Sequence, residues 1–152
     1  YLSGERTPHN DPNAQGVFFG LSHDTDQAAM AYAVLEGVAF GLADGLDALQ
    51  ASASNIQSLS LVGGGARSSW WAHLIATVLH LPVLAPVNSE AGAALGAARL
   101  AQLACGSSEA EVCYKPPIRA EFLPQPSDMV QERLHRFREL YKGLRPLFNV
   151  NV

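Results

Sequence analysis

The longest run of regularly spaced apolar residues predicts a helix over residues 27–52. Its apolar side chains recur at helical spacing and form one stripe, at Leu35, Val38, Leu42, Leu46 and Leu49. Either Asp24 or Asp26 can cap the first N–H groups of this helix. Three acids interrupt the apolar run, at Glu36, Asp44 and Asp47. They indicate a buried helix of a soluble protein rather than a membrane span.

The same helix carries a glycine at every fourth position, at Gly37, Gly41 and Gly45. Each glycine inside a helix costs on the order of 1 kcal/mol relative to alanine. We therefore expect this ridge to pack closely against another backbone, as a tight core contact rather than a hinge.

A different pattern follows over residues 58–71, which read SLSLVGGGARSSWW. Leu59, Leu61 and Val62 predict a half-buried strand, and residues 67–79 predict a helix. Glycines between them allow a positive φ and let a ligand lie against the backbone, while a helix N-terminus attracts an anion. The pattern favours a nucleotide phosphate or ribose site, or a tight turn that needs glycine for geometry alone.

Two familiar glycine-rich loops do not fit these residues. A Walker-type loop ends in Gly-Lys-Ser/Thr, whereas Ala66, Arg67 and Ser68 stand here. A Rossmann turn needs G-x-G-x-x-G and an acidic residue about 20 positions on, and the next predicted strand ends without a carboxylate. A nucleotide site at this turn would be of another type.

The remaining pattern predicts alternating strands and helices. We expect a short strand at residues 17–19, a second parallel strand at 82–85, and a helix at 91–104 capped by Asn88 or Ser89. Residues 107–126 are predicted to be a proline-rich linker. Residues 127–152 are predicted to form an amphipathic helix with one apolar face, made by Val130, Leu134, Phe137, Tyr141 and Leu144.

This order indicates an α/β fold with a parallel pair of strands. Because two or three strands are too few for such a sheet, we expect the missing strands to precede Tyr1 and the chain to be a fragment. A chain of 152 residues with 48% hydrophobic residues has ample material for a core. Only 16% of its residues are charged, which suggests a covering domain or subunit, or a homodimer.

Composition also excludes some partners. The net charge of −4 gives no electrostatic attraction to nucleic acid. No uninterrupted apolar run is long enough to predict a membrane span. Cys105 and Cys113 do not form a C-x-x-C pair, and we expect them to be reduced in a cytoplasmic protein. His73 and His80 could share a helix face, but no further metal ligand accompanies them.

Four segments resemble one family, the FGGY carbohydrate kinases, and most closely its xylulose kinases. The segments are YLSGERTPHNDPNAQGVFFGL (residues 1–21), the spacing Gly16-x-Phe18-x-Gly20-Leu21 followed by Met30 and AVLEG (33–37), LVGGGARSSWW (61–71) and EAGAALGAARLA (90–101). The third is similar to the adenosine motif of the family. Residues 1–106 then correspond to its carboxy-terminal domain, and residues 127–152 to a helix that packs on the missing first domain.

The resemblance implies an actin-like, ribonuclease H-like fold and an ATP- and Mg²⁺-dependent kinase. The reaction would convert D-xylulose and ATP to D-xylulose 5-phosphate and ADP. A carboxylate base and most sugar contacts would lie upstream of Tyr1, so the chain alone would be inactive and would hold no catalytic residue.

The resemblance also implies the site residues. Gly64 and Gly65 would face ATP, with Gly63 and Ala66 completing the turn, while Ser68 and Ser69 would either contact ATP or cap the helix. Glu5, Arg6 and Thr7 are expected near the cleft, and no residue is assigned to a metal. The alternatives are another FGGY kinase, acting on gluconate, ribulose, fuculose or glycerol, and a non-catalytic actin-like nucleotide-binding module.

Overall fold

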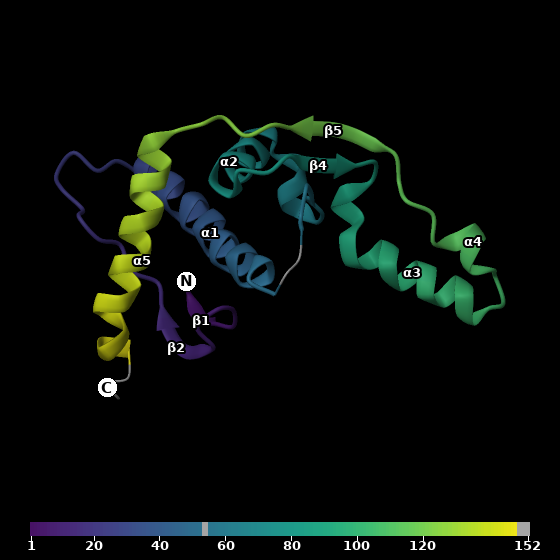
Figure 1. Ribbon diagram of the computed structural model, residues 1–152, viewed down its shortest axis with the longest axis horizontal. Helices are drawn as coiled ribbons and strands as arrows, with labels where there is room; N and C mark the ends of the chain where they lie inside the picture. The colour runs from purple at the N-terminus through teal and green to yellow at the C-terminus, as the bar shows by residue number, and fades with distance from the viewer. Residues whose placement is uncertain (53–54, 149–152) are drawn as a thin grey trace.

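The computed structural model describes residues 1–52 and 55–148 and is drawn in Figure 1. The first half contains β1 (Ser3–Glu5), β2 (Asp11–Gln15), α1 (Gln27–Gln50), β3 (Leu59–Ser60), the 3₁₀ helix η1 (Gly64–Arg67) and α2 (Ser69–Leu79). The second half contains β4 (Val83–Pro86), the 3₁₀ helix η2 (Ser89–Ala91), α3 (Gly92–Ala104), α4 (Glu109–Val112), β5 (Ile118–Phe122) and α5 (Asp128–Phe148).

The strands form one mixed sheet and one separate hairpin. β3 pairs with β4 in parallel, with Leu59 opposite Val83, as the sequence predicts. β5 pairs antiparallel with the other edge of β4, where Phe122 lies opposite Val83. β1 and β2 form an antiparallel hairpin of their own. The predicted partial α/β domain with a parallel pair of strands is therefore confirmed, and the unpredicted β5 makes its sheet mixed.

Two local predictions are wrong. Residues 17–19 are not a strand, and the hairpin of β1 and β2 comes before them. Residues 107–126, predicted to be a linker, contain α4 and β5. β5 is ordered because its backbone pairs with the otherwise open edge of β4, which removes an unpaired row of N–H and C=O groups. The division of the chain into domains stays a prediction.

The core lies between α1, α2, α5 and the sheet. Small side chains allow α1 and α2 to approach closely: Ala39, Ala72 and Ala76 are fully buried. Almost every residue of α2 from Ala72 to Leu79 is buried, because the helix lies between α1, the sheet and α5. Phe40, Ile75 and Phe122 fill the space between these elements.

The glycine ridge of α1 does not make the backbone contact that its spacing predicts, at least within the described residues. A Cβ at Gly37 or Gly45 would meet no atom within 4 Å, and one at Gly41 would meet only the Tyr1 ring at 3.8 Å. Gly37 and Gly41 instead line an open apolar groove.

Helix α5 packs along α1 and α2. Of its predicted apolar face, Val130, Leu134 and Tyr141 are buried, whereas Phe137 and Leu144 are partly buried. Val130 and Leu134 join the core, and Tyr141 is buried beside the hairpin. Contact of this helix with an upstream domain stays a prediction. α1 is long and apolar enough to cross a membrane by length and composition alone. Its acids Glu36 and Asp44 are nevertheless buried and paired with arginines of α5, which favours a core helix.

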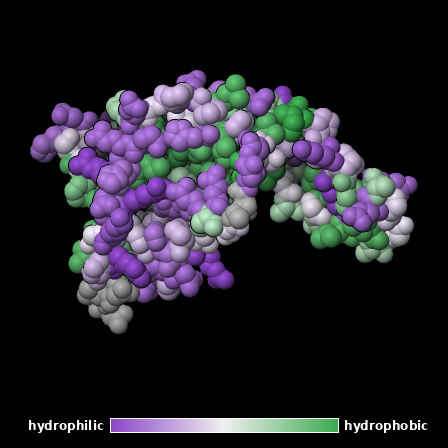
Figure 2. Space-filling model, viewed as in Figure 1, coloured by the Kyte–Doolittle hydropathy of each residue, from purple (hydrophilic) through white to green (hydrophobic). Residues whose placement is uncertain are grey.

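Helices α3 and α4 form an arm that projects away from these layers (Figure 1). No residue of α3 is buried, and hydrophobic side chains gather on the arm, whereas hydrophilic ones cover the α5 side (Figure 2). Arg99 ties the arm together, because its guanidinium donates to the carbonyl of Tyr114 at 2.9 Å and lies over that ring.

Candidate functional site

The glycine-rich turn lies at the carboxyl end of the parallel strands. β3 leads into Gly63, which has φ +90 and precedes η1. The loop after β4 reaches the same place, because the Gly63 N–H donates to the carbonyl of Ser89 at 2.7 Å. Ligands of open α/β sheets bind at the carboxyl ends of parallel strands. The sequence-predicted turn and the loop of residues 87–92 therefore meet at the edge where a ligand is expected.

The three glycines of the turn have different surroundings. A Cβ at Gly63 or Gly64 would meet nothing within 4 Å, so this side of the turn is open. A Cβ at Gly65 would lie 2.8 Å from Cε3 of Trp71 and closer still to Cζ3. Gly65 is therefore required by the packing of Trp71, whereas a side chain at Gly64 would enter open space.

The N–H groups of Gly64 and Gly65 are suited to an acceptor from outside the fold. They begin a 3₁₀ helix, where the first N–H groups have no intrahelical partner. Ala66 N–H and Ser68 N–H are already used, since they donate to the carbonyls of Gly63 and Gly65. Ala66 is buried, so its side chain anchors the turn in the fold.

The serines after the turn have separate roles. Ser68 caps α2, since its Oγ accepts from the Trp71 N–H at 3.2 Å. Ser69 is the first residue of α2 and is exposed, as is Arg67. Capping uses a lone pair of Ser68 and leaves its hydrogen available for donation. ATP contacts by Ser68 and Ser69 stay a prediction.

Arg119 is a residue of this region that the sequence analysis missed. It lies on β5, and its Nη2 donates to the carbonyl of Ala66 at 3.3 Å. The guanidinium brings a positive charge to the turn and ties it to the far edge of the sheet. Its position in the proline-rich segment hid it, because β5 was not predicted.

The cluster Glu5, Arg6 and Thr7 lies elsewhere. Its hairpin packs against α5, whereas the turn packs against α2 and η2 (Figure 1). The Glu5 carboxylate accepts from the His9 N–H at 2.8 Å, which closes the hairpin loop. Within this chain the structure does not bring these residues to the glycine turn, and their place in a cleft stays a prediction.

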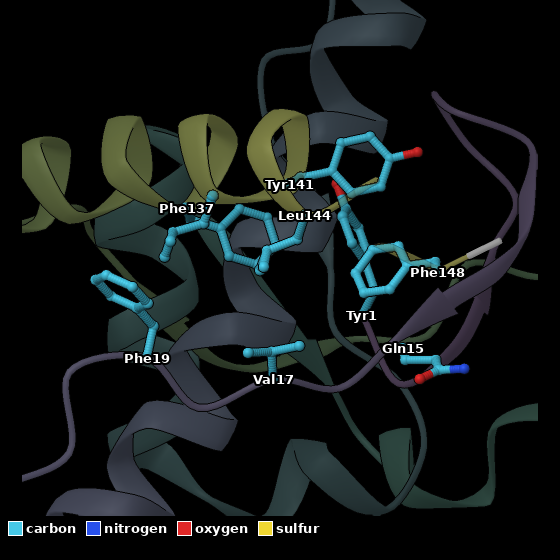
Figure 3. A pocket seen from close by; sticks show the side chains of 9 residues that line it. Tyr1, Gln15, Val17, Phe19, Phe137, Tyr141, Leu144 and Phe148 are labelled. Atoms are coloured by element: carbon cyan, nitrogen blue, oxygen red, sulfur yellow. The ribbon is translucent and has the colours of Figure 1, made fainter. Parts of the chain in front are cut away.

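The described cavities lie away from the turn. A small pocket of about 80 Å³ lies between the N-terminal segment and α5, and Figure 3 shows its aromatic lining, including Tyr1, Phe137 and Tyr141. A groove of about 700 Å³ runs along α1 beside residues 16–21. Both linings are mainly apolar, and neither includes Gly63, Gly64 or Gly65. The turn therefore lies outside these two cavities, and Gly64 is its exposed glycine.

No group of three or more His, Cys, Asp or Glu side chains in residues 1–52 and 55–148 is arranged to hold a metal ion. The His73 ring packs edge-on against Phe122, and His80 ends α2 in the left-handed region. The described residues thus offer no cluster of side chains that would hold a metal ion by themselves.

The tryptophans after the turn serve packing. Trp71 is half-buried against the core, and its Nε1 donates to the carbonyl of Leu35 in α1 at 3.2 Å. Trp70 is half exposed and packs edge-on against Tyr32. These contacts connect the residues just after the turn to α1.

Comparison with solved structures gives the class of the fold. The chain superposes on a xylulose kinase from Brucella ovis with a TM-score of 0.82 and 43% identity, covering 97% of this chain and 31% of that one. It superposes on a gluconate kinase from Lactobacillus acidophilus with a TM-score of 0.73 and 28% identity, covering 95% of this chain and 30% of that one. The chain thus has part of the actin-like, ribonuclease H-like fold of sugar kinases.

Sequence comparison gives the family. Residues 1–105 match the C-terminal domain of the FGGY family of carbohydrate kinases, and the chain belongs to this family. It is 45% identical to a xylulose kinase of Escherichia coli over 151 residues, which is 97% of this chain and 31% of that protein. The chain therefore spans about a third of the length of the curated relatives it matches.

Proposed function

We propose that the chain is the nucleotide-binding part of an ATP-dependent sugar kinase that phosphorylates D-xylulose. The turn of Gly63, Gly64, Gly65 and Ala66 binds the adenosine moiety or the adjoining phosphates of ATP. Ser68 and Ser69 supply further donors at the start of α2. The similarity to xylulose kinases supports the choice of sugar, and the kinase operates in the cytoplasm, where ATP is supplied.

One observation carries the nucleotide site. Gly64 lies at the carboxyl end of the parallel strands, and a side chain there would enter open space. The fold itself therefore does not require glycine at this position. A ligand that lies directly against the backbone, with donors from the start of a helix, accounts for it.

The chemistry is divided between this chain and the rest of the enzyme. A sugar hydroxyl oxygen forms a bond to the γ-phosphorus of ATP, the bond from that phosphorus to the β–γ bridging oxygen breaks, and ADP leaves. The hydroxyl proton passes to a carboxylate base, which we place outside this chain. Phosphoryl transfer depends mainly on positioning and on charge stabilisation. The turn contributes by fixing ATP, so the chain alone is inactive.

Mg²⁺ enters this proposal only with ATP. Mg²⁺ is generally bound through substrate phosphates together with one or two carboxylates. The described residues form no metal-binding cluster, and we place the carboxylates that hold Mg²⁺ with ATP in the rest of the enzyme.

The experiment uses the full-length protein that carries this chain, with Asp and Ala substitutions at Gly64. Gly64→Asp places a carboxylate where the nucleotide lies, and we expect the KM for ATP to rise by about tenfold or more. Gly64→Ala is the matched control for backbone effects and changes the KM less. Both variants are expected to keep the melting temperature of the parent within about 2 °C, since each new side chain enters open space.

An unchanged KM for ATP in Gly64→Asp, with the fold intact, would contradict the nucleotide site. Gly65→Asp is not a substitute for this variant, because it also displaces Trp71. A kinase assay of the parent with a panel of sugars tests the substrate.

A second candidate is an FGGY kinase for another substrate, such as gluconate. The superposition on a gluconate kinase supports it, although the TM-score of 0.73 is lower than the 0.82 found for the xylulose kinase. Higher kcat/KM with D-gluconate than with D-xylulose would select this candidate. Nucleotide binding without transfer to any sugar in the panel would select the non-catalytic module.

A further inference from the structure

We propose that Gly92, at the start of α3, is a positioning residue for the nucleotide-binding turn. The loop of residues 87–92 would hold the Gly63 N–H in place and thereby set the direction of the Gly64 and Gly65 N–H groups. This inference rests on the proposed function, and it assigns a role to a residue that follows the glycine-rich motif by almost 30 positions.

The two glycines approach each other closely. A Cβ at Gly92 would lie 3.3 Å from the Gly63 nitrogen and 3.5 Å from its Cα. That nitrogen is the atom whose N–H donates to the Ser89 carbonyl at 2.7 Å. A side chain at Gly92 would therefore press on the hydrogen bond that joins the two loops.

The backbone of Gly92 also requires glycine. Its φ of +37 and ψ of −112 lie outside the regions that residues with a side chain adopt readily. The unusual backbone conformation of Gly92 and its close approach to Gly63 occur at the same residue, in the connection between β4 and α3. Such a position is kept where the surrounding structure fixes it.

The loop is held rigidly enough to act on the turn. Ser89 is buried, with 3% of its surface exposed, so its carbonyl has a fixed position. The Val87 N–H donates to Pro117 at 2.9 Å on one side, and the Ala91 N–H donates to Asn88 at 3.0 Å on the other. The Ser89 hydroxyl oxygen is buried without a hydrogen-bond partner in the described part of the chain. The link to the turn is thus made by the backbone, not by this side chain.

The consequence follows along the chain from Gly63. Its φ of +90 is held by a hydrogen bond to a buried carbonyl, and η1 begins at the next residue. If the Gly63 N–H moves, the two donors that follow it rotate away from the nucleotide. Gly92 therefore affects ATP affinity without touching ATP.

The experiment compares three glycine-to-alanine variants of the full-length protein. Gly92→Ala introduces both backbone strain and the contact with Gly63. Gly106→Ala is the control for strain, because Gly106 has φ +96 and open space around its Cβ. Gly96→Ala is the control for a new methyl group on α3, because its Cβ also enters open space. KM for ATP, KM for the sugar and the melting temperature are measured for each.

We expect Gly92→Ala to raise the KM for ATP about tenfold and to leave the KM for the sugar unchanged. Gly106→Ala should lower the melting temperature through backbone strain and leave the KM for ATP unchanged. Gly96→Ala should leave both the melting temperature and the KM for ATP unchanged. Equal KM values for ATP in the Gly92 and Gly106 variants would overturn the proposal.

Two further results separate a failure of the nucleotide site from a failure of the role of Gly92. If Gly64→Asp leaves the KM for ATP unchanged, the nucleotide site itself fails; if it raises the KM and Gly92→Ala does not, only the present inference fails. Amide hydrogen exchange of the unsubstituted protein covers the case in which Gly92→Ala does not fold. Slow exchange at Gly63 without nucleotide is expected, and exchange at the unprotected rate would refute the link to Ser89.

Discussion

The ring of Trp71 occupies the place where a side chain at Gly65 would begin. A Cβ at Gly65 would lie 2.8 Å from Cε3 of that ring and 3.3 Å from Cη2. The ring is held there from the other side, because its Nε1 donates to the carbonyl of Leu35. One glycine of the turn is therefore fixed by packing within the chain, and its neighbour Gly64 is not.

This relationship predicts that Gly65→Ala destabilises the fold. The methyl group forces the Trp71 ring to shift, and overpacking of this kind costs about 1–3 kcal/mol of unfolding free energy. Urea denaturation of Gly65→Ala beside Gly64→Ala measures the difference. An equal loss of unfolding free energy in both variants would show that contact with the Trp71 ring is not the reason for glycine at position 65.

A double-mutant cycle separates the ring from backbone effects. Trp71→Leu is destabilising by itself, since it removes a half-buried ring and its hydrogen bond. In its background we expect Gly65→Ala to cost little, which gives a coupling energy of about 1 kcal/mol or more. If the losses of unfolding free energy simply add, the new methyl group at position 65 does not act through the Trp71 ring.

The start of α1 gives a second prediction, which distinguishes two neighbouring acids. Asp26 is the N-cap, and its Oδ1 accepts from the Ala29 N–H at 2.7 Å. Asp26→Ala should cost about 0.5–2 kcal/mol. Asp24→Ala, the matched control two residues earlier, should change the unfolding free energy by less than about 0.5 kcal/mol. Equal losses in thermal denaturation would refute the assignment of the cap.

Features that carry their own local signal were predictable from the sequence. The periodicity of α1 and α5, the parallel pair of strands and the glycine turn all follow from neighbouring residues. Asp24 and Asp26 could not be told apart, because both precede the same apolar pattern and only the backbone geometry selects one.

Features that depend on distant partners were not predictable. β5 was missed because four prolines surround it and its stability comes from pairing with β4. Arg119 and the Gly92 contact depend on the same tertiary arrangement. The acids of α1 showed only as interruptions of an apolar run, because the arginine that pairs with Glu36 lies 97 residues away.

The ion pair of Glu36 and Arg133 gives a third prediction. Nε and Nη2 of the guanidinium both donate to a carboxylate that is only 6% exposed. Nε lies 2.9 Å from Oε2 and 3.1 Å from Oε1, and Nη2 lies 2.7 Å from Oε1. These hydrogen bonds raise the pKa of Arg133. Arg133→Met leaves Glu36 with the Tyr32 hydroxyl as its remaining described donor. We expect a loss of about 1–3 kcal/mol, less than for a fully buried pair because water reaches Arg133.

Two further variants test this interpretation by chemical denaturation. Adding Glu36→Gln to Arg133→Met removes the unpaired charge and should recover part of the loss. Lys142→Met removes an exposed pair with Glu139 and should cost less than about 0.5 kcal/mol. If Lys142→Met cost as much as Arg133→Met, burial of Glu36 would not be the reason.

The last prediction concerns acid stability and the hydrogen bond between Tyr141 and Asp11. The buried Tyr141 hydroxyl donates to Asp11 Oδ2 at 2.9 Å, and this bond lowers the pKa of Asp11 from its ordinary value of 3.8. Burial raises the pKa of Tyr141, so its hydroxyl stays protonated and remains a donor.

Because the folded state has the lower Asp11 pKa, the carboxylate stabilises the fold above about pH 4, and this contribution is lost as the pH falls through the lowered pKa. Tyr141→Phe should therefore be less stable than the parent near pH 6, and this difference should narrow as the pH falls through the lowered pKa of Asp11. Urea midpoints measured across this range test it, with Tyr114→Phe, an exposed tyrosine, as the control. A stability difference between the parent and Tyr141→Phe that does not narrow as the pH falls would show that Asp11 is not the acceptor that matters.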